Sequence, residues 1–241
     1  MKQSLDGRTV LVTGANGGLG QQFVEQALER GARKVYAAAR SPKRWDSAKV
    51  EAVSLDITNA GDIARIVAAA RDVDLLINNA GIAPEGDLIT GAIEELRHIF
   101  ETNFFGALAL ANAFAPVLAA NGGGTLLNIL SAAAWISVPT GYGASKAAMW
   151  SATNALRLAL KGQQTQVIGL LVGMVDTPMT TRWDFPKVSA ASVVEKAYDG
   201  VANGAMEILA DDAALELKSR LSLKAEELYS WMDEQLRTFV P

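Results

Sequence analysis

A tyrosine, a lysine and a serine close together in the chain have the chemistry of a proton-transfer site. Tyr142 and Lys146 are four residues apart, so at the start of a helix their side chains share one face about one turn apart. A free tyrosine has a pKa of about 10 and is a poor base at neutral pH, but a nearby ammonium lowers that pKa. Tyr142 could then protonate a carbonyl oxygen or deprotonate an alcohol, while Ser131 hydrogen-bonds the same oxygen.

Such a pair is by itself usually a partly buried ring and a solvated charge, so its meaning depends on the rest of the chain. A glycine-rich segment, Thr13-Gly-Ala-Asn-Gly-Gly-Leu-Gly20, lies between an expected strand at 8–13 and an expected helix at 18–30. Its glycines allow a sharp turn close to a pyrophosphate, and the helix N-terminus offers free N–H groups. We expect a dinucleotide here, contacted by Gly14, Asn16, Gly18, Leu19 and Gly20.

The end of the next expected strand indicates which dinucleotide. In such sites an acidic residue about 20 positions beyond the glycines holds the ribose 2′-OH of NAD, whereas an arginine accommodates the 2′-phosphate of NADP. Here the strand ends Ala-Ala-Ala-Arg40, with no carboxylate, and with Lys43 and Arg44 just behind. An arginine can bind a phosphate through two parallel hydrogen bonds. Arg40 therefore favours NADP over NAD. The alternative is that an isolated arginine simply solvates a strand end.

Short apolar segments alternate with longer amphipathic ones along the whole chain and must position these residues. Expected strands are 8–13, 34–39, 50–55, 73–77, 125–130, 166–172 and 207–210; expected helices are 18–30, 60–70, 90–120 (one or two helices), 142–160 and 190–203. Apolar strands that are each followed by a helix predict an α/β fold, a doubly wound parallel sheet with helices on both faces. We expect a single domain over 1–241, with a short lid around 178–189 and a charged C-terminal helix at 213–238.

Composition excludes several other kinds of chemistry. The 241 residues include no cysteine and one histidine, His98, which leaves no disulfide, no Cys-ligated metal and no Ser-His-Asp triad. A net charge of −4 argues against a nucleic-acid surface. The N-terminus lacks a signal-peptide pattern, and we expect no apolar run to reach the roughly 20 residues that cross a bilayer. The sequence thus predicts a cytoplasmic protein without a membrane partner.

Six motifs together resemble the short-chain dehydrogenase/reductase family, whose fold is of the Rossmann type. They are the Thr13–Gly20 turn, Asn78-Asn79-Ala80-Gly81, Asn103, Ser131, Tyr142-x-x-x-Lys146 and Asp176-Thr177-Pro178. They occur in the family's order over roughly residues 8 to 180. The resemblance implies hydride transfer between NADP(H) and a ketone, aldehyde or secondary alcohol, with Asn103, Ser131, Tyr142 and Lys146 as catalytic residues.

The resemblance also implies positions for the cofactor and for a proton path. Asp56 and Ile57 would flank the adenine, Asn78 and Ala80 the cofactor ribose, and Val175 with Thr177 the carboxamide; Asn79, Gly81, Tyr142 and Lys146 would complete the cofactor contacts. The positive charge of oxidised nicotinamide would help to lower the pKa of Tyr142. Asn103 resembles the residue that bends a helix in this family and whose backbone carbonyl holds a water leading protons to the lysine.

Departures from the family pattern concern the substrate and the assembly. Only eleven positions separate Ser131 from Tyr142, about two fewer than in most relatives, so that loop is expected to be tighter. Val172-Gly173 keeps the glycine that allows close approach to the nicotinamide. The glycine-rich closing segment is missing, which gives a homodimer more weight than a tetramer. Five apolar residues suggest an apolar pocket for a hydrophobic substrate: Ile82, Trp135, Met179, Trp183 and Phe185.

Two other functions are compatible with such a scaffold. A redox-sensing protein of the same fold would keep the dinucleotide site without catalysis, but relatives of that kind typically lose the tyrosine or the lysine. A dehalogenase would need an altered glycine turn and an arginine in place of Lys146. The sequence keeps both the turn and the pair, so the oxidoreductase is the leading hypothesis.

Overall fold

A parallel sheet in the order β3-β2-β1-β4-β5-β6-β9 forms the centre of the computed structural model, which describes residues 5–84, 88–136 and 140–239. Its strands are β1 (Thr9–Thr13), β2 (Lys34–Ala39), β3 (Val50–Ser54), β4 (Leu75–Asn78), β5 (Thr125–Ile129), β6 (Gln166–Leu171) and β9 (Glu207–Leu209). Every residue of β1, β4 and β5 is buried, as expected for strands covered on both faces. The predicted doubly wound α/β fold is confirmed.

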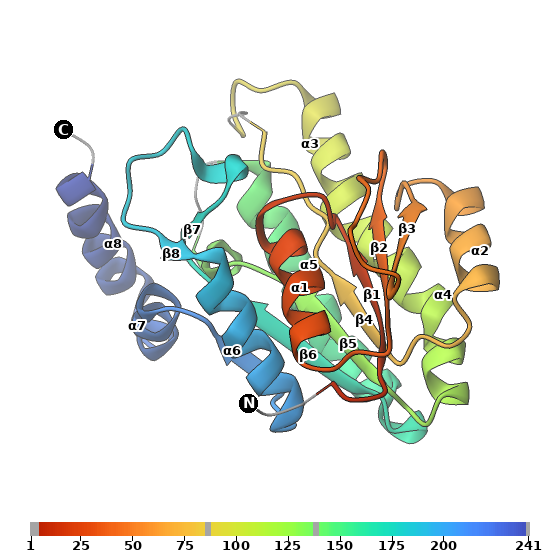
Figure 1. Ribbon diagram of the computed structural model, residues 1–241. Coiled ribbons are helices and arrows are strands. Elements are labelled where there is room, and N and C mark those ends of the chain that lie inside the picture. Colours follow the sequence, from red (N-terminus) through yellow and green to blue (C-terminus); the bar gives the residue numbers. More distant parts are fainter. Residues whose placement is uncertain (1–4, 85–87, 137–139, 240–241) are drawn as a thin grey trace.

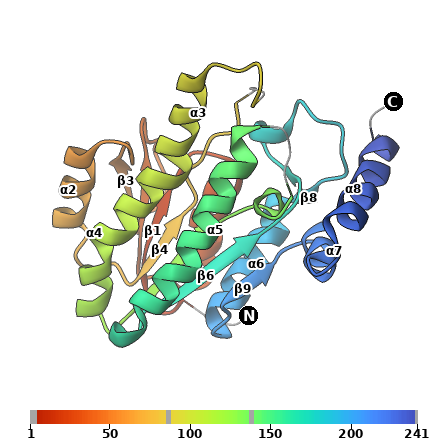
Figure 2. The same ribbon diagram turned by 180° about the vertical axis from the view of Figure 1, so that it is seen from behind.

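Helices cover both faces of this sheet (Figures 1 and 2). On one face α1 (Gly18–Glu29) packs beside α6 (Ala190–Ala202); the ring of Tyr198 stands edge-on to that of Phe23, 5.5 Å between centroids, and its hydroxyl donates to Phe23 O at 2.6 Å. On the other face lie α2 (Ala60–Ala69), α4 (Ala107–Ala120) and α5 (Gly141–Ala159). These helices supply the second buried cluster, centred on Phe114 and Ile66.

The strand order changes direction between β1 and β4. From β1 the chain moves outward to β2 and β3, then returns to β4 on the other side of β1 and continues to β5, β6 and β9. Ligands of open α/β sheets bind beyond the carboxyl ends of the strands at such a reversal. Thr13 and Asn78 end the two strands at this point, so both motifs that follow them, the glycine turn and Asn79-Ala80-Gly81, meet there.

The segment 93–120 forms one continuous helical stretch. It consists of α3 (Ile93–Phe100), the π-helix η1 (Glu101–Gly106) and α4. Contrary to the sequence-based expectation, this 28-residue stretch is long and apolar enough to span a membrane by length and composition. Leu110, Phe114 and Leu118 on it are fully buried against the sheet. Packing on the sheet therefore accounts for this part of its apolar character.

The C-terminal segment forms two helices where the sequence predicted one. α7 (Asp212–Arg220) and α8 (Ala225–Phe239) are separated by a turn. The turn lets Leu217 of α7 and Leu228 of α8 join one buried cluster together with Ala132 and Trp135. The two helices therefore contribute to the same part of the core.

Short elements complete the connections between these strands and helices. They are the 3₁₀ helices η2 (Ala132–Ala134), η3 (Lys161–Gln163) and η4 (Pro178–Thr180), and the paired short strands β7 (Val175–Asp176) and β8 (Val188–Ser189). The β7–β8 pairing closes the segment between them into a loop. This loop carries Met179, Trp183 and Phe185, the residues of the predicted lid.

Candidate active site

The glycine turn forms a cradle at the end of β1. Gly14 and Gly18 have φ angles of +65° and +53°, which L side chains rarely adopt. A Cβ on Gly20 would lie 2.1 Å from Gly14 O, so α1 can approach the turn only without a side chain there. No side chain caps the N-terminus of α1 at Gly17, which leaves its first backbone N–H groups available to an anion.

The residues after β4 brace this turn. The hydroxyl of Thr13 accepts from the backbone N–H groups of Asn79 and Ala80 at 3.0 and 2.9 Å, and the Asn79 side chain donates to Thr13 O at 2.8 Å. Asn79 therefore holds the turn through its side chain. Asn78, which the family resemblance placed beside the ribose, instead points into the core: its amide donates to Ala107 O and to Asn128 Oδ1, both at 3.0 Å.

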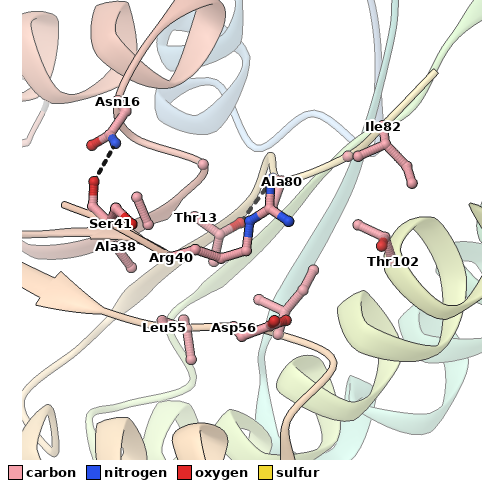
Figure 3. Close-up of a pocket in the computed structure, with 14 residues that line it drawn as sticks. Thr13, Asn16, Ala38, Arg40, Ser41, Leu55, Asp56, Ala80, Ile82 and Thr102 are labelled. Atoms are coloured by element: carbon pink, nitrogen blue, oxygen red, sulfur yellow. Dashed lines mark hydrogen bonds between the residues drawn. The ribbon is translucent and has the colours of Figure 1, made fainter. Parts of the chain in front are cut away.

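A cleft of about 420 Å³ opens beside the turn (Figure 3). It contains seven of the predicted cofactor contacts: Gly14, Asn16, Arg40, Asp56, Ile57, Ala80 and Gly81. Sequence reasoning did not assign Thr13, Ala38, Ala39, Ser41, Leu55 or Thr102, which also line it; Ile82 completes the lining. Most of these residues lie at or just beyond the ends of β1, β2, β3 and β4, and this position was the available signal.

Several predicted contacts do not line this cleft. Gly18, Leu19, Gly20 and Asn79 shape or brace the turn from outside the cavity. Thr177 lies against the turn from the other side: its side-chain carbons would be 3.2–3.3 Å from a Cβ on Gly18. Val175 is buried in β7. The structure thus brings the segment after β6 to the glycine turn, next to the cleft and not in it.

The cleft has a positive side chain at one end. Arg40 is exposed at the end of β2, and Figure 3 shows its guanidinium group between the segments of Ala80 and Asp56. Hydrogen bonds from the hydroxyl and the N–H of Thr58 hold the pKa of Asp56 below its usual value, and the charge of Arg40 contributes. Asn16 ties the turn to the Arg40 segment by donating to Ser41 O at 2.7 Å.

Ser131, Tyr142 and Lys146 come together at the carboxyl end of β5. Ser131 is buried and begins η2, accepting from Ala133 N at 3.1 Å. Tyr142 and Lys146 occupy the first turns of α5. The Ser131 side chain hydrogen-bonds that of Tyr142, while Lys146 Nζ donates to Ile129 O at 2.8 Å and lies 5.7 Å from the centroid of the Tyr142 ring. The predicted catalytic trio is therefore one cluster.

Gly81 connects this cluster to the cleft. It lines the cleft, and a Cβ at this position would be 3.6 Å from Lys146 Nζ and 3.3 Å from Asn103 Oδ1. A glycine here thus lets the chain after β4 pass close to the lysine. A molecule bound along the cleft past Ala80 and Gly81 would reach the reactive side chains.

Burial sets the charge state of the pair in the ligand-free chain. It lowers the pKa of Lys146 to about 8, because the ammonium loses its hydration. Burial also raises the pKa of Tyr142, and the hydrogen bond with Ser131 offsets this only in part. This direction is opposite to the one expected for the working site. The ammonium here points at a backbone carbonyl, Ile129 O.

Asn103 sits inside the π-helix η1, so the predicted helix distortion takes the form of one wide turn. Its side chain donates to Ile82 O at 2.9 Å and to Ser145 Oγ at 3.0 Å, and accepts from Ile82 N at 2.8 Å. Ser145 in turn donates to Tyr142 O at 2.7 Å. Asn103 therefore joins the cleft segment at Ile82 to the first turn of α5.

The expected lid is tied to the loop after β4. The guanidinium group of Arg182 donates to Ala83 O at 2.6 Å and lies over the Trp183 ring, 4.0 Å from its centroid. Trp183 and Phe185 are half-buried, whereas Met179 is largely exposed. Trp135 packs instead with Trp150 and Lys218, away from this loop. The five residues of the predicted apolar pocket are thus divided between the lid, the cleft and the C-terminal helices.

A second, smaller cavity of about 100 Å³ lies between η2 and α5. Residues that flank the catalytic trio line it, among them Ala133, Trp135, Gly143 and Ala147. Leu88 contributes from the loop before α3. Its lining is apolar apart from Thr140, but it includes neither Ser131 nor Tyr142. The predicted tighter loop contains residues 137–139, which lie outside the described part of the chain.

Comparison with known proteins places this geometry in context. Residues 8–186 match the family of short chain dehydrogenases. The chain is 31% identical over 216 residues to a ketoacyl reductase, HetN, from a Nostoc species, covering 82% of this chain and 75% of HetN. It is 34% identical over 221 residues to the short-chain dehydrogenase PC-15 of Penicillium crustosum, covering 83% and 78% of the two chains.

Solved structures agree with the sequence relatives. A short chain dehydrogenase from Burkholderia cenocepacia, crystallised in complex with NADP, superposes with a TM-score of 0.89 at 35% identity, covering 95% of this chain and 98% of that one. One from Burkholderia phymatum, in complex with NAD, reaches 0.81 at 24% identity, covering 95% and 96%; this second likeness supports the fold. The matched family segment contains both the glycine turn and the Ser131–Tyr142–Lys146 cluster. This chain belongs to the short-chain dehydrogenase/reductase family of oxidoreductases.

Proposed function

We propose that this protein transfers a hydride between NADP(H) and a ketone, an aldehyde or a secondary alcohol, with Tyr142 as the acid and base. The observation that carries the proposal is the position of Gly81. It lines the cleft and lies beside Lys146 Nζ, so one bound molecule can extend from Arg40 to the hydrogen-bonded pair of Ser131 and Tyr142. A cluster remote from the cleft would have no electron donor within reach.

The residues of the cleft fit a phosphorylated dinucleotide. The turn at Gly14 and Gly18 and the uncapped N-terminus of α1 would hold the pyrophosphate. Arg40, exposed at the end of β2, would bind the 2′-phosphate that distinguishes NADP from NAD. The carboxylate in this cleft, Asp56, already accepts two hydrogen bonds from Thr58. The NADP complex of the Burkholderia cenocepacia relative supports the same choice.

The side chains divide the proton chemistry among them. A bound nicotinamide supplies or accepts the hydride at the substrate carbon. The raised pKa keeps Tyr142 protonated at neutral pH, so it can donate its proton to the carbonyl oxygen as the C–H bond forms. The hydroxyl of Ser131 would hold that oxygen and stabilise the charge developing on it. Lys146, with a pKa of about 8, carries the positive charge that stabilises the phenolate left behind.

The surroundings suit an uncharged, hydrophobic substrate. Trp183 and Phe185 in the loop after β7 are half-buried, and the bond from Arg182 to Ala83 O holds this loop toward the segment after β4. Ile82 is itself part of the cleft lining. An apolar wall of this kind excludes water and binds a substrate through its carbon skeleton. We therefore expect bulky ketones or the corresponding secondary alcohols to be accepted.

The experiment is a panel of aromatic and alicyclic ketones assayed by loss of NADPH absorbance. Tyr142→Phe removes only a hydroxyl and should reduce kcat by about 10²–10⁴-fold with NADPH affinity nearly unchanged. Tyr229→Phe on α8, where the ring is exposed, is the matched control and should behave as the wild type. NADPH binding without turnover of any substrate would favour the sensor hypothesis. Near-wild-type turnover by Tyr142→Phe would refute the mechanism.

A further inference from the structure

A single peptide unit, between Val172 and Gly173, is held from both sides. Its carbonyl oxygen accepts from Ala132 N at 2.9 Å and from Ser131 Oγ at 3.5 Å. Its N–H group donates to Asp211 Oδ2 at 2.8 Å. The peptide unit is planar and rigid, so the carboxylate on one side and the Ser131 segment on the other are coupled through one flat group.

Asp211 comes from a remote part of the chain, directly after β9. It is only 5% exposed, and its second oxygen accepts from Ala214 N at 2.9 Å as the N-cap of α7. Both carboxylate oxygens therefore have a backbone partner. A carboxylate–amide bond is shorter and stronger than a neutral one, so this contact fixes the peptide more firmly than an ordinary ladder bond.

The glycine in this contact has a specific reason to be there. A Cβ on Gly173 would lie 2.8 Å from Asp211 Oδ2 and 3.1 Å from Ala213 Cβ. It would point at the C-terminal segment, so a side chain would push the carboxylate out. The sequence assigned this glycine to close approach of the nicotinamide. The structure gives Gly173 a second role: without a side chain it leaves space for the Asp211 carboxylate to reach the backbone N–H.

The clamped peptide stands between two parts of the active site. Upstream, β6 pairs with β5, which ends at Ile129, shortly before Ser131. Downstream, the chain runs through β7 to Thr177, which lies against Gly18 of the glycine turn. Behind Ser131, α7 contributes Ala214 and Leu217 to the buried cluster that contains Ala132. A shift of the Val172–Gly173 peptide would therefore move the Ser131 hydroxyl and the Thr177 segment together.

We propose that Asp211 is a positioning residue, which sets the Val172–Gly173 peptide and through it Ser131 and the segment 174–177. This inference rests on the proposed function in one respect: the segment is taken to receive the nicotinamide end of the cofactor. Asp211 touches no reacting atom. Its effect should be confined to that end of the site, leaving the adenine and 2′-phosphate end near Arg40 undisturbed.

The test compares two variants of Asp211 with a control in the same segment. Asp211→Ser keeps an N-cap acceptor for α7 but is too short to reach Gly173 N; Asp211→Asn keeps the size and has one oxygen for two amides. Lys196→Met is the control, because Lys196 Nζ donates to the carbonyl of the preceding residue, Ala210, at 2.8 Å. It loosens the same junction without touching Gly173.

Hydrogen exchange of the ligand-free proteins is the first measurement. Asp211→Ser should accelerate exchange of the Gly173 amide about ten- to hundredfold, Asp211→Asn should have a smaller effect, and Lys196→Met should leave that amide as in the wild type. Wild-type exchange in Asp211→Ser, or equal acceleration in Lys196→Met, would overturn the proposal. This readout needs no cofactor, so it decides the structural coupling even if the wild type binds no nucleotide.

Nucleotide affinity and turnover are the second measurement. Asp211→Ser should lower kcat about ten- to hundredfold, since small displacements of reacting groups have effects of this size, and should weaken NADP⁺ binding. Affinity for adenosine 2′,5′-bisphosphate, which lacks the nicotinamide, should be unchanged. Equal weakening of both ligands would indicate a general structural role and overturn the proposal. A wild type that binds neither ligand would refute the proposed function. The hydrogen-exchange result would still decide whether Asp211 holds the Gly173 amide.

Discussion

Because the Lys146 side chain is buried, the free energy of unfolding should rise between pH 8 and pH 10. Lys146→Met should abolish this rise. Burial lowers the pKa of Lys146 from 10.5 to about 8. Between these values the unfolded chain binds a proton that the folded chain has lost, so the free energy of unfolding rises with pH. Below pH 8 both states are protonated, and the full cost of burying the charge remains.

The size of the effect follows from the two pKa values. The interval from about 8 to 10.5 corresponds to about 3 kcal/mol, of which about 2–3 kcal/mol should be recovered by pH 10. Lys146→Met also loses the hydrogen bond to Ile129 O, which leaves a buried carbonyl unpaired at a cost of about 1–3 kcal/mol. That loss does not depend on pH. The difference in unfolding free energy between wild type and Lys146→Met should therefore change with pH only by the about 2–3 kcal/mol that comes from the pKa shift.

Urea unfolding at pH 7, 8, 9 and 10 measures this difference directly. The wild type should gain about 2–3 kcal/mol relative to Lys146→Met between pH 7 and 10. Tyrosines whose pKa burial raises, such as Tyr198, are common to both proteins and cancel. Lys161→Met, at an exposed lysine, should run parallel to the wild type at all four pH values. If Lys146→Met does the same, the ammonium is not desolvated as the structure implies.

Three further predictions concern the cofactor, the lid and the assembly. Arg40→Asp should weaken NADPH binding at least about a hundredfold and NADH binding far less, whereas Arg44→Asp, outside the cleft lining, should leave the preference intact; titrations of both nucleotides decide this. Trp183→Ala should raise KM for bulky ketones more than for small ones, and a uniform loss with a lower melting temperature would instead make Trp183 a core residue. We also expect a homodimer through the face formed by η1, α4 and α5, where Phe105 and Leu158 are 51% and 78% exposed. Replacing both residues by Glu should give a monomer on sedimentation, and a monomeric mass of the wild type would refute the prediction.

Local features of the fold were predictable because they depend on short stretches of chain. The positive φ angles at Gly14 and Gly18 follow from residues that alone tolerate them. Short apolar runs, such as Val-Leu-Val in β1 and Leu-Leu in β5, indicated strands covered on both faces. The four-residue spacing of Tyr142 and Lys146 was enough to place both on the first turns of one helix. Each of these conclusions uses geometry that is fixed within a few residues.

Other features required the folded chain. The sequence could not tell that Asn78 points into the core while Asn79 braces the glycine turn, because adjacent residues at a strand end face opposite ways and the sheet decides which face is buried. The break between α7 and α8, and the cluster that Leu217 and Leu228 share across it, became visible only in the folded chain. The helical stretch 93–120 is long enough to span a membrane, and only the structure shows that part of it packs against the sheet.

The sequence by itself determined the family motifs, the glycine turn, the proposed catalytic trio and the positive charge at Arg40. Only the tertiary structure decided the protonation of that trio and what holds it in place. The pKa of Tyr142 depends on its burial, and Asp211 meets Gly173 across 38 positions. Desolvation and long-range hydrogen bonds are properties of the assembled molecule, because neither exists until remote segments exclude water together.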